Sequence, residues 1–218
     1  MNLCLVIVGR DYVEALHGGV KHLSNLKINK IYVLTNKKLR VSKILEDYDV
    51  EYFNYTEKYF SYFDKLYFLL EIIQKTNSST VYVDVRRLKS LLYYDLINIE
   101  QGINTIGPWG DDTKTADKLI NKKTECFEKG YFNDIVKSFD INPKKIKTVL
   151  EQLLVITPDI NSKEIFDILK NKEELFIETS ITKKSSYEYV GNGEGLALGY
   201  AAEITSTPVH KLKLLNYL

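Results

Sequence analysis

An aspartate and an arginine stand where a buried strand is expected to end. Residues 80–85 form a β-prone run, and Asp84 and Arg86 bring charge to its far end. In an open α/β sheet, ligands bind at the carboxyl ends of the strands. A carboxylate there can hold a divalent cation that neutralises a diphosphate, and a guanidinium binds phosphate oxygens directly. The pattern also fits a helix cap or a surface salt bridge for Asp84, so these interpretations stay open.

Two candidates lie near the carboxyl terminus. Glu194 stands between Gly193 and Gly195 at the expected start of a helix. Glycine lets a ligand approach the backbone, and a carboxylate there can act as a general base or orient a substrate hydroxyl. Its alternative role is to pair with the positive end of the helix dipole. His210 is a candidate ligand for a metal ion or a phosphate, and its alternative is an ordinary surface histidine.

Two other side chains could contact a ligand. Lys65 is expected on the polar side of a helix over residues 61–74, where it can meet a nucleotide base or phosphate. An isolated lysine at such a position is more commonly only solvated. Trp109, in the glycine-rich stretch 107–112, can stack on a sugar ring or anchor its loop in the core.

Apolar patterning in the first ninety residues alternates between strands and helices. A capping box, Ser61-x-x-Asp64, begins the clearest helix. The expected strands are 3–8, 30–35, 50–54 and 80–85, and the expected helices are 11–26, with a break at Gly18 and Gly19, 38–48 and 61–74. This alternation predicts an α/β fold with a mostly parallel or mixed central sheet and helices on both faces.

The second half of the chain is less regular. Residues 91–99 are apolar and predict a helix, and Asn142 followed by Pro143 is typical of a helix start. The apolar residues from Ile146 to Leu154 then recur at helical spacing. Further helices are expected over 162–170 and 196–204, and a strand over 175–179.

Composition limits the classes of protein. The 218 residues are 44% hydrophobic and no linker divides them, so one domain over 1–218 is expected. Lys and Arg total 30 against 29 Asp and Glu, which does not favour a nucleic-acid partner. Cys4 and Cys126 have neither disulfide nor metal-site spacing, and no run approaches the roughly 20 apolar residues of a membrane span. With no basic leader, we expect a cytoplasmic protein without a transmembrane segment.

Two segments together resemble the nucleotide-sugar glycosyltransferases of the GT-A fold. They are residues 63–70, with Lys65 followed by Leu66, and residues 81–86, ending Asp84-Val85-Arg86. In that family, a helix with a Lys-Leu pair commonly precedes a hydrophobic strand that ends in a DxD motif. The turn Gly9-Arg10-Asp11 is similar to the end of the family's first strand, and residues 193–202 are similar to its acidic helix.

The resemblance implies a single GT-A-like, Rossmann-like domain with a nucleotide-binding half, 1–90, and an acceptor-side half, 91–218. Its activity would be transfer of a sugar from a nucleoside diphosphate donor to a hydroxyl of a glycan, protein or small molecule. The implied metal is Mn²⁺ or Mg²⁺. The implied roles are catalysis by Asp84 and Glu194, nucleotide binding by Gly9, Arg10, Asp11, Lys65 and Arg86, and metal binding by Asp84 and His210.

Arg86 departs from the family pattern, because the third DxD position should be a carboxylate and an arginine cannot ligate a cation. Three outcomes are open: Asp84 holds the metal with His210, Arg86 replaces the metal, or the chain is a catalytically inactive nucleotide- or partner-binding protein. A sugar-phosphate nucleotidyltransferase is disfavoured, because residues 8–11 lack that group's glycine-rich loop.

Overall fold

The computed structural model describes residues 1–57, 60–106, 115–119, 131–137, 139–176, 182–184, 187–190 and 193–215. Trp109 and the stretch 107–112 lie outside the described residues. So does most of the strand expected over 175–179, whose first two residues instead end a helix.

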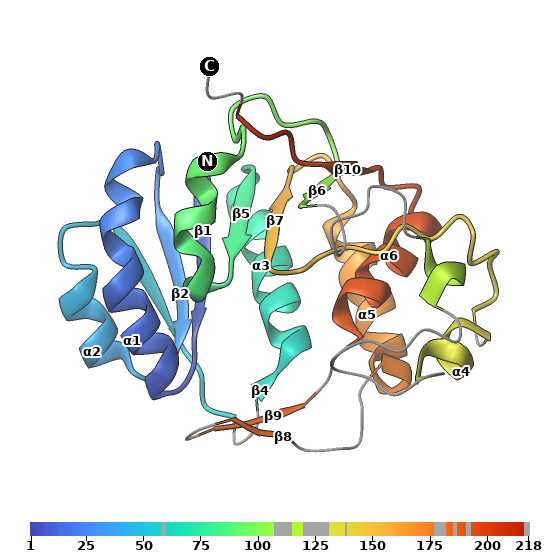
Figure 1. The fold of residues 1–218 in the computed structure, drawn as a ribbon, viewed down its shortest axis with the longest axis horizontal. Coiled ribbons are helices and arrows are strands. Elements are labelled where there is room, and N and C mark those ends of the chain that lie inside the picture. The colour runs from blue at the N-terminus through green and yellow to red at the C-terminus, as the bar shows by residue number, and fades with distance from the viewer. Residues whose placement is uncertain are drawn as a thin grey trace.

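A seven-stranded mixed sheet forms the centre of the molecule (Figure 1). All neighbouring strands are parallel except β7, which runs antiparallel to both of its neighbours. The order across the sheet is β10 (Val209–Lys211), β6 (Ile103–Thr105), β7 (Leu153–Ile156), β5 (Thr80–Val83), β1 (Asn2–Ile7), β2 (Ile31–Thr35) and β3 (Val50–Asn54).

Both faces of the sheet are buried, which explains the apolar character of its strands. In β1, Leu3 and Leu5 pack into one core, whereas Cys4 and Val6 pack into the other. The first core is covered by α1 (Arg10–Gly19), η1 (Val20–Asn25), α2 (Lys38–Ile44) and η2 (Val85–Tyr93). The second is covered by α3 (Tyr62–Thr76), α5 (Ser162–Phe176) and α6 (Glu194–Ile204). The predicted α/β sheet with helices on both faces is confirmed.

The short elements lie around this framework. β4 (Phe60–Ser61) pairs with β9 (Tyr187–Val190), which pairs with β8 (Thr182–Lys184), in a second sheet of three strands. In Figure 1 this small sheet lies at one edge of the molecule, below the central sheet. Two further helices in the described part of the chain are η4 (Ala116–Leu119) and α4 (Tyr131–Lys137). Among the described residues, no helix has the length and apolar character needed to cross a bilayer.

The capping box predicted at Ser61 is confirmed. The Ser61 hydroxyl accepts a hydrogen bond from the Phe63 N–H at 3.2 Å, and the Asp64 carboxylate accepts one from the Ser61 N–H at 2.9 Å. These contacts satisfy two of the free N–H groups at the start of α3. The cap therefore fixes where α3 begins, and with it the position of Lys65.

We expect Ser61→Ala to lower the free energy of unfolding by about 1 kcal/mol, because the Phe63 N–H loses its acceptor. Urea denaturation measures the change. Ser42→Ala is the control: that hydroxyl bonds the Leu39 carbonyl on the exposed face of α2, where a change within about 0.5 kcal/mol is expected. Equal effects of the two substitutions would contradict the capping role.

Two helices predicted in the second half are wrong. Residues 146–154 form a turn and loop leading into strand β7, and residues 94–99 are not helical. The Asn142 side chain accepts a hydrogen bond from the Lys144 N–H at 3.0 Å, so it caps one turn rather than a helix. Because β7 is buried on both faces in the middle of the sheet, its apolar residues are contiguous, and a short contiguous run does not distinguish a strand from a helix.

Candidate functional site

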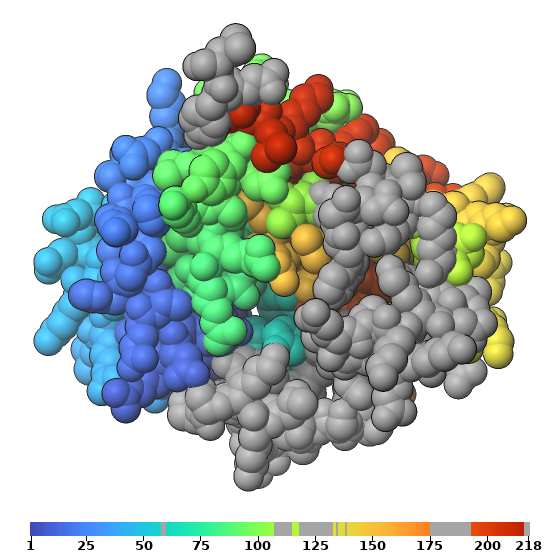
Figure 2. Space-filling model, in the orientation of Figure 1, coloured from blue at the N-terminus to red at the C-terminus, as the bar shows by residue number. Residues whose placement is uncertain are grey.

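A small cavity opens at the carboxyl ends of β1 and β5. Its walls come from these strand ends, the first turn of α1 and the junction of β4 with α3, and they include Val8, Tyr12, Tyr62, Lys65 and Asp84. Figure 2 shows the surface hollowed between η2, in green, and α3, in teal. The strand order changes direction at β1 and β5, and open α/β sheets bind ligands at such a point.

A much larger cavity, of about 890 Å³, lies at the opposite edge of the sheet and is lined by such residues as Met1, Ser79 and Leu91. It adjoins the amino ends of β1 and β5. Volume alone therefore does not locate the site, and we place it at the carboxyl edge, where the charged side chains gather.

Asp84 has both of the roles left open by its sequence position. One carboxylate oxygen accepts a hydrogen bond from the Arg86 N–H at 2.9 Å and so caps η2. The same side chain lines the cavity. The Asp84 N–H donates to the Gln152 carbonyl at 2.9 Å, which ties the end of β5 to the start of β7. The cap orients the carboxylate at the mouth of the site.

Arg86 is exposed, and its guanidinium lies over the ring of Tyr12, 4.4 Å from the ring centre. This cation–π contact holds a positive charge beside the cavity that Tyr12 lines. Arg87 is also exposed, and its N–H donates to the Asp84 carbonyl in the same turn.

The predicted nucleotide turn forms the junction between β1 and α1. Gly9 has a φ of 90°, a conformation that favours glycine, and its N–H donates to the Asn36 side chain at 3.1 Å. Asp11 is half-buried in the first turn of α1. Arg10 instead pairs with Glu14 along the exposed surface of the helix at 2.8 Å. The start of α1 therefore brings backbone N–H groups to the cavity, whereas the Arg10 guanidinium is held by its own helix.

Lys65 is buried, so the prediction that it lies on the polar side of its helix is wrong. Its ammonium pairs with Glu194 at 2.8 Å and with Glu151 at 3.8 Å. It also lies 5.2 Å from the ring centre of Tyr62 and 5.9 Å from that of Tyr82. Carboxylates from distant parts of the chain compensate for the burial of this charge, and Lys65 is one of the residues that line the cavity.

Close backbone packing brings Glu194 to this ammonium. The first turn of α6 lies against residues 149–151, and the Val149 N–H donates to the Gly195 carbonyl at 3.2 Å. A Cβ on Gly195 would overlap the Val149 carbonyl oxygen. The glycine after Glu194 is thus required for the close approach of two chain segments, rather than for the approach of a ligand to the backbone.

Burial and charge act in opposite directions within this cluster. Burial lowers the pKa of Lys65, but the combined attraction of Glu194, Glu151 and Asp84 outweighs it, so the pKa of the ammonium is raised. For Glu151, burial and the charge of Glu194 raise the pKa of the carboxyl to about 7, against the attraction of Lys65. Glu151 therefore changes charge near neutral pH.

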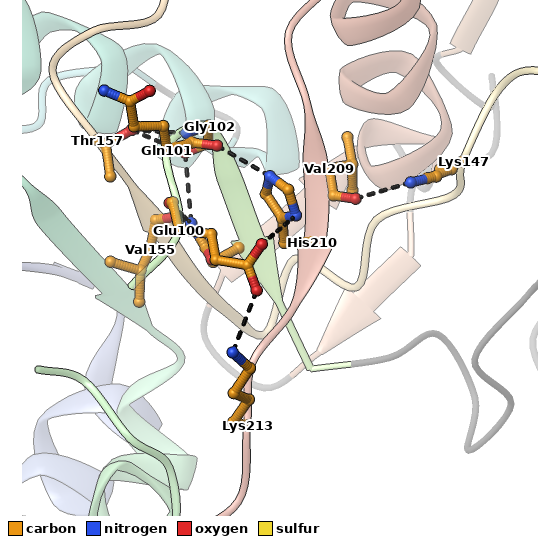
Figure 3. A network of polar contacts seen from close by, with 10 residues as sticks. Glu100, Gln101, Gly102, Lys147, Val155, Thr157, Val209, His210 and Lys213 are labelled. Carbon is orange, nitrogen blue, oxygen red and sulfur yellow. Dashed lines mark hydrogen bonds and ion pairs between the residues drawn. The ribbon is translucent and has the colours of Figure 1, made fainter. Parts of the chain in front are cut away.

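His210 lies elsewhere, on β10 (Figure 3). Its Nδ1 lies 3.1 Å from a Glu100 carboxylate oxygen, and its Nε2 lies 2.9 Å from the Gln101 carbonyl oxygen. In the sheet, His210 is in register with Val81 of β5, through β6 and β7. Three strand spacings amount to about 14 Å. The structure therefore does not bring His210 together with Asp84.

The donor set at the cavity does not fit a protein-built Mn²⁺ or Mg²⁺ site. Asp84 is the carboxylate on the cavity wall, and one of its oxygens already caps η2. Within the described part of the chain, no three His, Cys, Asp or Glu side chains gather as metal ligands. Such ions prefer several oxygen ligands, and here the nearest charged groups include the cations Lys65 and Arg86.

Comparison with known proteins then places the fold. The chain resembles the galactosyltransferase LgtC, solved with donor and acceptor sugar analogues, with a TM-score of 0.51 and 11% identity over 97% of this chain and 73% of that one. An active-site mutant of LgtC gives a TM-score of 0.50 and 10% identity over 97% and 72%. The fold is GT-A-like. A 4-diphosphocytidyl-2C-methyl-D-erythritol synthase from Anaerococcus prevotii gives 0.49 and 11% over 99% and 87%. No family model and no curated protein matches the chain.

The structure adds two residues that sequence analysis did not single out. Tyr12 follows the Gly9–Asp11 turn by one position and supports Arg86. Glu151 stands just before the apolar run that forms β7, and its carboxylate contacts Lys65 from a distant part of the chain. A charged residue just before the start of a buried strand is the signal that could have pointed to Glu151.

Proposed function

We propose that this protein binds a nucleoside diphosphate sugar at the carboxyl ends of β1 and β5 and transfers the sugar to an acceptor hydroxyl. The observation that carries the proposal is the convergence of Asp84, Lys65 and the start of α1 at the point where the strand order of a GT-A-like sheet changes direction. The likeness to a galactosyltransferase supports the fold, and the site supports the chemistry.

The main electrostatic task in this reaction is to stabilise the departing diphosphate. Arg86, held over Tyr12, supplies a guanidinium that matches phosphate oxygens. The N–H groups at the start of α1 add the positive end of a helix dipole. Lys65, which lines the cavity, contributes a positive charge, and Glu194 fixes its position. Asp84 orients η2 and so places Arg86. No step is assigned to a metal ion, because the donor set does not fit one.

Nucleotide binding tests the proposal. Thermal shift and calorimetry with UDP, GDP, CDP and their sugars should show stabilisation by one nucleotide class, because a ligand of the native state raises its stability. We expect binding to persist in EDTA, and Arg86→Ala to weaken it about tenfold or more through loss of a charge-assisted hydrogen bond. Lys89→Ala, an exposed change on the same helix η2, should leave affinity unchanged. A protein that binds none of these ligands would contradict the proposal.

Measurement of turnover distinguishes an enzyme from an inactive nucleotide-binding protein. The inactive alternative is favoured by Arg86, which stands at the third motif position in place of a carboxylate. Slow hydrolysis of the nucleotide sugar, followed by chromatography, is expected from an active transferase. Binding without any hydrolysis or transfer would support the inactive alternative. Release of pyrophosphate from a nucleoside triphosphate would instead indicate nucleotidyl transfer on the same fold.

A further inference from the structure

Glu151 is held beside the reaction site by the central sheet. Val83 of β5 is in register with Leu153 of β7, and the Asp84 N–H donates to the carbonyl of Gln152, the residue that follows Glu151. These backbone contacts fix Glu151 at the same sheet edge as Asp84. From there its carboxylate comes within 3.8 Å of the Lys65 ammonium. Its position is thus set by main-chain pairing, as a precise catalytic group requires.

The two carboxylates around Lys65 are not equivalent. The Glu194 side chain is 4% exposed and forms the short 2.8 Å contact with the ammonium. The Glu151 side chain is 23% exposed and forms the longer contact. The charge of Glu194 raises the pKa of the Glu151 carboxyl, so the two groups interact. Glu194 is therefore enclosed and paired with Lys65, whereas Glu151 is the member of the pair that an incoming hydroxyl can reach.

We propose, on the basis of the transferase function above, that Glu151 is the general base of the reaction and that Glu194 is a positioning residue. The acceptor O–H bond breaks and its proton passes to the Glu151 carboxylate. The acceptor oxygen forms a bond to the anomeric carbon, and the bond from that carbon to the diphosphate oxygen breaks, with its electron pair leaving on the diphosphate. A single displacement of this kind inverts the anomeric configuration.

The charges that face Glu151 suit this role. Lys65 of α3 favours its ionised form, whereas Glu194 of α6 disfavours it. Asp84, at the end of β5, acts on the same ammonium. The balance leaves the Glu151 carboxyl with a pKa of about 7, near the value at which a general base works best at neutral pH. Turnover is therefore expected to rise as the pH passes upward through about 7.

The decisive variant is Glu151→Gln, which keeps the shape and removes the base. We expect turnover of the donor that the binding screen identifies, with methanol as a surrogate acceptor, to fall by about 10²–10⁴-fold. Nucleoside diphosphate affinity should stay within about threefold of wild type, and the residual rate should lose its rise with pH. Glu203→Gln, on α6 and outside the cavity, is the matched control and should keep full turnover.

Two readouts keep the inference separate from the proposed function. A wild-type protein that binds no nucleotide would refute the function itself. Nucleotide binding with unchanged turnover and pH profile in Glu151→Gln would refute only the role of Glu151, as would a methyl glycoside formed with retained configuration, detected by NMR. Should the amide variant fail to fold, Glu151→Asp keeps an acid one methylene shorter, and it should retain the pH profile at a reduced rate.

The pH dependence of stability gives a test that needs no substrate. In the folded protein Glu151 keeps its proton up to about pH 7, whereas in the unfolded chain it loses that proton near its ordinary value. Its contribution to stability is therefore present at low pH and lost as the pH rises to about 7. Urea denaturation of wild type and Glu151→Gln should show this loss in wild type alone. Parallel curves for the two proteins would show that the pKa of Glu151 is not raised in the folded protein, and would overturn its role as a base that works near neutral pH.

Discussion

Lys65→Met is expected to lower the free energy of unfolding by about 3–5 kcal/mol, because it leaves the buried Glu194 carboxylate without its cation. Glu194 is 4% exposed and has its 2.8 Å contact with this ammonium. Methionine fills a similar volume, so the cost arises from the lost charge rather than from a cavity. A loss of this size is a large share of the total stability of a typical domain.

Urea denaturation at pH 7 measures the effect, and Lys75→Met is the matched control on the same helix. Lys75 pairs with Glu51, but its side chain is 52% exposed, so its loss should cost less than about 1 kcal/mol. Lys65→Met combined with Glu194→Leu should recover part of the stability, because it removes the stranded carboxylate. Similar losses from the two single lysine variants would show that the buried ion pair contributes no more to stability than the exposed one.

The first half of the fold could be predicted from the sequence because its signals are local. The strands β1, β2 and β5 are largely apolar runs, and α3 begins at a recognisable cap. The second half depends on tertiary context. Strand β7 has no clear local signal in the sequence. The run around Val149 and Leu150 has the spacing of a helix, but it lies in a turn and loop.

The site was predictable where chemistry coincides with a strand end, as at Gly9 and Asp84. It was not predictable where partners come from distant segments. Lysine is rarely buried, so residue type placed Lys65 at the surface, and only the folded chain shows Glu194, 129 residues later, beside it. For His210 the error runs the other way. Its place near the end of the chain suggested that it belongs to the site, but the sheet order places its strand, β10, three strand spacings from β5.

Gly199→Ala is expected to destabilise the protein by about 3 kcal/mol, at the upper end of the usual cost of overpacking. A Cβ on Gly199 would overlap the Lys147 carbonyl oxygen, which is backbone and cannot rotate away. The helix α6 would have to move off the segment 146–149. That movement would also draw Glu194 away from Lys65, so nucleotide binding should weaken together with stability.

Thermal denaturation compares this variant with Gly18→Ala, another glycine within a helix. A Cβ on Gly18 meets nothing within 4 Å, so alanine should stabilise α1 by about 0.5–1 kcal/mol through its higher helix propensity. The two substitutions are chemically identical and should shift the melting temperature in opposite directions. A stabilising effect at Gly199 would mean that α6 does not pack against Lys147 as closely as the structure shows.

The distance in sequence between Lys65 and its partners bears on the order in which the chain matures on the ribosome. Once the first ninety residues have emerged, β1, β2, β3 and β5 can already pair, and α3 can begin to cover them. At that moment neither Glu151 nor Glu194 has been synthesised, and β5 has no partner on its outer side. The Lys65 ammonium must therefore stay in water, which keeps α3 from docking fully. When β7 and α6 are synthesised, β7 pairs with β5, and Glu151 and Glu194 reach the Lys65 ammonium at the same stage. The two halves of the chain therefore gain their stability in one cooperative step.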